Sequence, residues 1–163
     1  MRSTLIVLAA VLLCGCGSGS NGDGDSDGDG DGGKSAYIAS AEAICSDANR
    51  SQEAQAVPTS AGGFAPYVRK VVEIASTASG AVGALQPPAQ DSARLREKFL
   101  DPLARQVEAG RAYADKVEKA ETAGDQAELL RLVGQAPTTP EVDLEFVRQY
   151  GMPACAKAAD TSS

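Results

Sequence analysis

The sequence contains no histidine and no tryptophan, and its aromatic side chains amount to three phenylalanines and four tyrosines among 163 residues. The lack of histidine removes both the commonest general base and the commonest transition-metal ligand. The scarcity of aromatic rings leaves a hydrophobic core built from alanine, valine, leucine and isoleucine. Because alanine is the strongest helix former, this composition favours closely packed helices over a sheet.

Basic side chains are also few. The chain has 15 lysines and arginines against 22 aspartates and glutamates, a formal net charge of −7. Part of this excess comes from one glycine-rich stretch, which holds Asp23, Asp25, Asp27, Asp29 and Asp31. The rest of the chain is nearly balanced and shows no basic patch. We therefore predict that the protein binds no nucleic acid.

Long apolar runs are limited to one, Leu5–Leu13, which follows a short start containing Arg2. Its nine residues would reach about 14 Å as a helix, far short of the roughly 30 Å hydrocarbon core of a bilayer. We therefore interpret residues 1–15 as a signal peptide and not as a transmembrane helix.

The residues at the end of this run, Leu13-Cys14-Gly15-Cys16, are typical of a lipoprotein signal. The small Gly15 suits the position before the cut, and the thiol of Cys16 would carry the diacylglyceryl group. An ordinary secretory signal is the alternative, and it would leave Cys16 as a free thiol. The lipoprotein interpretation predicts a protein held on the outer face of the cell membrane by acylated Cys16. Its partners would then be the lipid bilayer and an envelope protein.

Residues 16–34 form a segment rich in glycine, aspartate and serine, with no apolar side chain after Cys16. Such a segment cannot bury a core, so we expect a disordered tether. The run from Asp23 to Gly28 also matches the opening of an EF-hand calcium loop, but the twelfth position, which needs a bidentate glutamate, is Lys34. We prefer a solvated tether to a weak calcium site, and we predict no metal ligand.

The cysteines outside the signal peptide allow a simple assignment. Cys14 leaves with the signal peptide and Cys16 is acylated, so Cys45 and Cys155 remain. A single pair in an exported protein favours one disulfide, and two buried reduced thiols are the alternative. Without a histidine or a free cysteine, we predict that the protein is not an enzyme and uses no cofactor.

The remaining chain repeats apolar residues at helical spacing, which predicts an all-α domain over residues 35–156, a small bundle of four to five helices. Pro102 falls inside the longest pattern and should kink or split that helix. Gly124, Asp125 and Gly151 supply the expected helix ends. We expect helices at about 35–56, 65–86, 91–123, 125–133 and 139–150, and a flexible tail over residues 157–163.

The two cysteine segments also resemble a known group of proteins. Tyr37–Asn49 (YIASAEAICSDAN) and Tyr150–Cys155 (YGMPAC) are similar to the opening and the close of small secreted actinobacterial lipoproteins. Leu85-Gln86-Pro87-Pro88 is similar to the junction after the second helix in that group. The resemblance implies an all-helical domain pinned by a disulfide between its ends. It implies no activity, because members are mostly described only as lipoproteins of unknown function.

Two functions fit these observations. We favour a non-catalytic binding or adaptor module at the cell envelope, because a tether, a compact bundle and charged outer faces suit contacts with other proteins. The alternative is a small-molecule carrier with an apolar pocket inside the bundle, lined by Phe99, Tyr113, Phe146 and Tyr150. The simpler interpretation of these four side chains is ordinary core packing, which we prefer.

Overall fold

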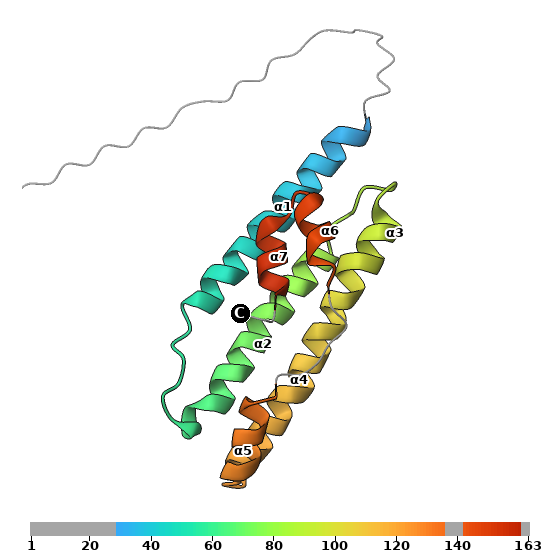
Figure 1. Cartoon of the computed structure of the whole chain (residues 1–163). Coiled ribbons are helices and arrows are strands. Elements are labelled where there is room, and N and C mark those ends of the chain that lie inside the picture. Colours follow the sequence, from blue (N-terminus) through green and yellow to red (C-terminus); the bar gives the residue numbers. More distant parts are fainter. Residues whose placement is uncertain (1–28, 136–141, 161–163) are drawn as a thin grey trace, which may run out of the picture.

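The computed structural model describes residues 29–135 and 142–160, and every regular element in these ranges is helical. Helix α2 lies between the two other long helices and contacts both (Figure 1). The three long helices are α1 (Asp29–Glu53), α2 (Phe64–Gly83) and α4 (Asp101–Thr122). The four short helices are α3 (Ser92–Leu95), α5 (Gln126–Val133), α6 (Leu144–Gln149) and α7 (Pro153–Ala159). The predicted all-α bundle is confirmed.

Helix α1 begins earlier than its sequence suggests. We expected its start near Ser35, but the helix begins at Asp29 and passes through several glycines. A helix that is already held by packing extends by further residues without a new nucleation step. Residues 29–34 of the expected tether are therefore helical, and residues 1–28 lie outside the described ranges. Tyr37, Ala41, Cys45 and Ala48 of α1 recur at helical spacing and are buried.

Helix α7 is a correction to the expected tail. We placed a flexible tail from residue 157 onward, but α7 continues to Ala159, and the side chains of Ala156 and Ala159 are 0% and 3% exposed. A short run of alanines after Pro153 carries little local signal. Its burial comes from packing against α1, which a local pattern does not encode.

Two side chains of α1 form hydrogen bonds with backbone N–H and C=O groups at the start of α7. The backbone N–H groups of Ala154 and Cys155 donate to Oε1 of Glu42, at 2.8 and 3.2 Å. The amide nitrogen Nδ2 of Asn49 donates to the carbonyl oxygen of Ala154 at 2.9 Å. Glu42 thus acts as a cap from a distant helix, and its negative charge lies at the favourable end of the α7 dipole.

The long helix around Pro102 adapts without breaking. A π-helical segment, Arg96–Leu100, joins α3 to α4 without a gap. Because proline has no N–H, the carbonyl of Lys98, four residues earlier, loses its α-helical partner. The backbone N–H of Asp143 donates to that carbonyl instead, at 3.0 Å. The irregularity that we predicted at Pro102 is therefore a π-helical segment. The carbonyl oxygen of Lys98, which Pro102 leaves without a helical partner, binds the start of α6 to the long helix.

Three helix ends follow the sequence signals. Gly124 and Gly151 have φ values of 68° and 101°, which glycine adopts without strain. The Asp125 carboxylate accepts a hydrogen bond from the backbone N–H of Glu128 at 3.0 Å and caps α5. Helix α6 begins after Asp143, which caps it; the start that we expected at residue 139 lies outside the described residues.

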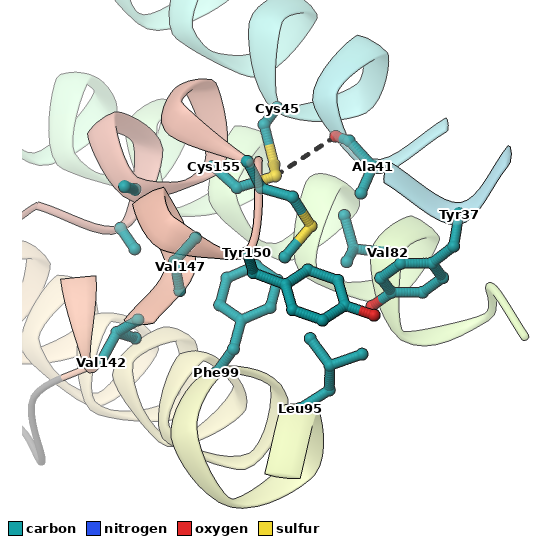
Figure 2. Packing of buried hydrophobic residues seen from close by; sticks show 13 residues of the cluster. Tyr37, Ala41, Cys45, Val82, Leu95, Phe99, Val142, Val147, Tyr150 and Cys155 are labelled. Carbon is teal, nitrogen blue, oxygen red and sulfur yellow. Dashed lines mark hydrogen bonds between the residues drawn. A yellow bond between two sulfur atoms is a disulfide. The ribbon is translucent and has the colours of Figure 1, made fainter. Parts of the chain in front are cut away.

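The hydrophobic core consists of two clusters. The larger one joins α1, the end of α2, α3, the π-helical segment, α6 and α7, and its fully buried side chains include Val82, Leu95 and Phe99 (Figure 2). The smaller one joins α2, α4 and α5 through Ala65, Val117, Ala120, Leu129 and Leu132. The large side chains are therefore concentrated in the half of the bundle where the chain ends meet.

The predicted disulfide is present in the larger cluster. Cys45 of α1 and Cys155 of α7 are bonded at an S–S distance of 2.05 Å, with their Cα atoms 4.9 Å apart (Figure 2). The two residues are separated by 110 positions in the sequence. The bridge thus joins the first and the last described helices.

Candidate functional site

Several predicted site residues cannot be placed. Cys16, the expected lipid carrier, and the run from Asp23 to Gly28 lie outside the described residues. In the part of the chain that the structure describes, no helix is both long and apolar enough to cross a bilayer. The same residues hold no cluster of three or more cysteine, aspartate or glutamate side chains that could bind a metal ion.

Two glycine motifs in and next to the tether match catalytic patterns by their letters. Gly28–Ser35 fits the phosphate-binding pattern GxxxxGK(S/T), and Gly24–Gly28 fits the nucleophile pattern GxSxG. A phosphate loop follows a strand and wraps its backbone N–H groups around the phosphate, whereas Asp29–Ser35 lies within α1 and carries two aspartates. The GxSxG serine works with a histidine, which the chain lacks. Neither motif has the context that its chemistry needs.

The four aromatic side chains proposed for a carrier pocket do not meet. Phe99 is fully buried in the larger cluster, where the rings of Phe146 and Tyr150 also pack, with centroids 5.7 Å apart. Tyr113 packs against the smaller cluster, and its hydroxyl donates to the carbonyl oxygen of Leu132 at 2.9 Å. The four residues are therefore divided between two cores, which they fill.

Three polar residues, Lys34, Asp91 and Tyr150, connect the start of α1 to the rest of the bundle. The hydroxyl of Tyr150 donates to Oδ2 of Asp91 at 2.8 Å, and the ammonium of Lys34 lies 3.7 Å from the same oxygen. Lys34 also lies 4.4 Å from the centroid of the Tyr150 ring. Burial, together with the negative Asp91 carboxylate, raises the pKa of Tyr150. Each of these three polar groups has a partner among the other two, and the contacts hold the first turns of α1 against the bundle.

The hydroxyl of Tyr37 is the exception within this region. Among the described residues it is the buried side-chain polar atom that has no hydrogen-bond partner, and burial raises its pKa. Figure 2 shows the hydroxyls of Tyr37 and Tyr150 pointing toward one another. No described cavity opens beside them, so the pair is part of the core.

The strongest candidate site is an apolar groove beside α5. The exposed large hydrophobic residues of the described ranges are Val57, Leu130 and Val133, with exposed fractions of 72%, 74% and 54%. All three line one hollow of about 380 Å³, which we call the α5 groove. Its other lining residues are Pro58, Thr59, Ser60, Phe64, Gln126 and Leu129. No lining residue is charged.

The fold places this groove at one end of the bundle. Helix α5 lies where α4 ends and α2 begins, opposite the end where α1 begins (Figure 1). One wall is formed by α5 and the other by the segment that leads from α1 into α2. The floor includes Phe64 and Leu129, which also pack in the smaller core cluster. The groove therefore lies between a helix, α5, and the connecting segment that leads from α1 toward α2.

Helix α5 has two apolar faces, and sequence reasoning missed the second. Leu129 and Leu132 are 6% and 4% exposed and face the core, whereas Leu130 and Val133 lie three residues apart on the groove side. Adjacent residues on a helix point about 100° apart, so Leu129 and Leu130 cannot both face the core. Two adjacent leucines in a short helix were the available signal.

A hollow between α2 and α4 is occupied by internal polar contacts. It measures about 510 Å³ and is lined in part by Arg69 and Arg111. Arg69 forms ion pairs with Asp115 and Glu118, and Arg111 donates a hydrogen bond to the Ser76 hydroxyl. Both guanidinium groups thus have partners within the protein, and this hollow lacks a free binding group.

Comparisons of the chain with protein-family models, curated proteins and solved structures find no match. The function is therefore argued from the residues and their geometry.

Proposed function

We propose that the protein is a lipid-anchored, extracytoplasmic binding module without catalytic activity, and that the α5 groove is its binding surface. The observation that carries the proposal is the convergence of Val57, Leu130 and Val133 on one uncharged hollow. Single exposed apolar residues are ordinary, but a contiguous apolar patch commonly marks an interaction site.

The position of the groove suits an anchored protein. Acylation at Cys16 would place the membrane on the N-terminal side of α1, and α5, which forms one wall of the groove, lies at the opposite end of the bundle (Figure 1). A bundle attached in this way would present the groove to the surroundings of the membrane. The resemblance to actinobacterial lipoproteins supports the same location.

The expected binding energy is moderate. Burying a leucine or valine side chain contributes about 1.5–3 kcal/mol, and less where the side chain is already half covered. Three such side chains therefore offer on the order of 5 kcal/mol, from which the loss of rotational and translational freedom is subtracted. We expect weak, reversible binding that gains from the confinement of both partners to one envelope.

A carrier of small apolar molecules is the second candidate. The hollow of about 380 Å³ falls at the lower end of the volumes that small-molecule sites occupy, about 300–1,000 Å³. If the protein is a carrier, the groove is a better place for the ligand than the aromatic residues first considered, because those residues are packed into the core.

The anchor is tested by replacing Cys16. We expect Cys16→Ser to abolish metabolic labelling with palmitate and to release the protein from the membrane fraction. The matched control, Cys14→Ser, should retain both, because Cys14 belongs to the removed peptide. Equal labelling of the Cys16→Ser variant and the wild type would refute the lipoprotein proposal.

The groove is tested by site-specific photo-cross-linking in intact cells. A photoreactive phenylalanine at Val57 or Leu130 should give a discrete adduct, and the same residue at exposed Arg148 on α6 should not give it. A second substitution, Val133→Ser, should remove the adduct without a change in folding, since the side chain is 54% exposed. The same adduct from all positions, or none from the groove, would contradict the proposal.

A further inference from the structure

We infer that the occupant of the α5 groove is a short amphipathic helix of a partner protein, which inserts one apolar side chain into the hollow. This inference rests on the proposed function and adds the class of ligand. It follows from three properties of the groove, which are the exposure of its walls, the absence of charge in its lining and its length.

The apolar walls of the groove are too exposed for a small ligand to cover them. A molecule confined to the hollow would bury the floor at Phe64 and Leu129, which are already packed in the core. Leu130 and Val57, at 74% and 72% exposed, would keep most of their apolar surface in water. A larger occupant that fills the hollow and also lies over both walls removes this surface from water, and a protein segment does so.

The lining selects an occupant with a neutral, apolar contact face. Six lining residues are apolar, and the polar ones, Thr59, Ser60 and Gln126, carry no charge. A charged side chain placed here would lose its hydration without gaining an ion pair, which is costly. Charges on the partner must therefore lie on its outer face, and this division into two faces is what an amphipathic helix provides.

The length of the groove fits about two helical turns. Helix α5 has eight residues, which corresponds to about 12 Å at 1.5 Å per residue. Leu130 and Val133 are one helical turn apart, so a helix lying along α5 can place apolar residues at positions i, i+3 or i+4, and i+7 against them.

The size of the site argues against a second copy of this chain. Nine residues line the groove, whereas a stable dimer uses about 20–30 residues from each subunit. A helix that docks in a groove, in contrast, needs only a few anchoring side chains. Self-association is therefore an outcome that the experiment must be able to detect.

The test is a selection of displayed peptides of 14 random residues on the mature chain with Cys16→Ser, counter-selected on the same chain with Leu130→Ser. We expect the enriched peptides to share apolar residues at i, i+3 or i+4, and i+7. Synthetic peptides from this set should bind at least tenfold more weakly to the Val57→Ser and Leu130→Ser variants. The control variant Ala104→Ser, on the exposed side of α4, should bind like the parent.

Circular dichroism and thermal melting verify that each variant is folded, and exposed substitutions of this kind usually change stability by less than about 0.5 kcal/mol. Enriched peptides without helical periodicity, or no enrichment over the counter-selected variant, would overturn the inference. So would a dimer in sedimentation velocity that Leu130→Ser dissociates, or saturable binding of dodecanoate at the groove in place of peptide. Groove-specific cross-links in cells without helical peptides in the selection would refute this inference and leave the proposed function standing.

Discussion

Replacing Cys45 by serine should lower the melting temperature by roughly 10 °C or more. Loss of a native disulfide from a small exported domain typically costs about 2–5 kcal/mol, and each kcal/mol corresponds to several degrees for a domain of this size. The separation of 110 positions between the two cysteines makes the entropic effect on the unfolded chain large, about 5 kcal/mol in the loop-closure model. Cys155→Ser should show a similar fall.

The position of the bridge explains why so much stability depends on it. Helix α7 has seven residues, too few to form a stable helix alone. Its remaining ties to α1 are the cap from Glu42, the hydrogen bond from Asn49 and an exposed ion pair between Lys157 and Glu53 at 2.6 Å. Exposed ion pairs contribute little, so α7 is held by the disulfide, the apolar packing around it and the hydrogen bonds with Glu42 and Asn49.

Chemical reduction provides the matched control. The wild-type protein in a strong reductant should melt like the Cys45→Ser variant, and that variant should not respond to the reductant. The double variant should be no less stable than either single one, because all three lack the same constraint. A melting temperature of Cys45→Ser within 2 °C of the oxidised wild type, on the order of 0.5 kcal/mol, would contradict this role of the bridge.

Much of the fold was predictable because its signals are local. Gly124, Asp125 and Gly151 stand at helix ends for reasons that act within one turn, namely backbone conformation and a side-chain cap. The pairing of Cys45 with Cys155 needed only a count of cysteines and the expectation of an oxidising compartment. The periodicity of the apolar residues then sufficed for the helical class.

The parts that were missed depend on contacts between distant segments. The last residues of α7, from Lys157 to Ala159, were expected to belong to a tail because the contacts that hold this helix are not local; its cap, Glu42, lies 112 positions from Ala154. The four aromatic residues were grouped by type, but Tyr113 belongs to the opposite end of the long helix from Phe99 and packs in another cluster. Spacing shows that each residue faces a core, but it does not show which core.

The groove was missed for a related reason. The sequence analysis did not single out Leu130, because one exposed apolar residue is normally unremarkable. Its meaning appears only when Val57, more than seventy positions earlier in the printed sequence, lies on the opposite wall of the same hollow. When a binding site is assembled from separate segments, its sign in the sequence is an additional apolar residue on a helix that already has a buried face.

Phe99→Ala should be the most destabilising single substitution in the core. Phe99 is fully buried and is the largest of the fully buried side chains in the described residues. Removing a buried phenylalanine side chain typically costs about 3–5 kcal/mol, through lost apolar burial and the cavity that remains.

The backbone around Phe99 adds to the expected effect. Phe99 lies in the π-helical segment Arg96–Leu100, and its neighbour Lys98 accepts the hydrogen bond from Asp143 that fixes the start of α6. A cavity at this point therefore loosens the contact between the long helix and the α6–α7 pair. Denaturant unfolding should show a large fall in the midpoint, and limited proteolysis should cut first near Lys157 or Arg148.

Two further variants keep the prediction measurable if Phe99→Ala does not fold. Phe99→Leu retains most of the side-chain volume and should lose roughly 1–2 kcal/mol. Phe146→Ala removes the same ring from a half-buried position, where the guanidinium of Arg94 lies 5.0 Å from its centroid, and should cost less than Phe99→Ala. If Phe146→Ala proved the more destabilising of the two, the larger cluster would have its centre at α6 and not at the π-helical segment.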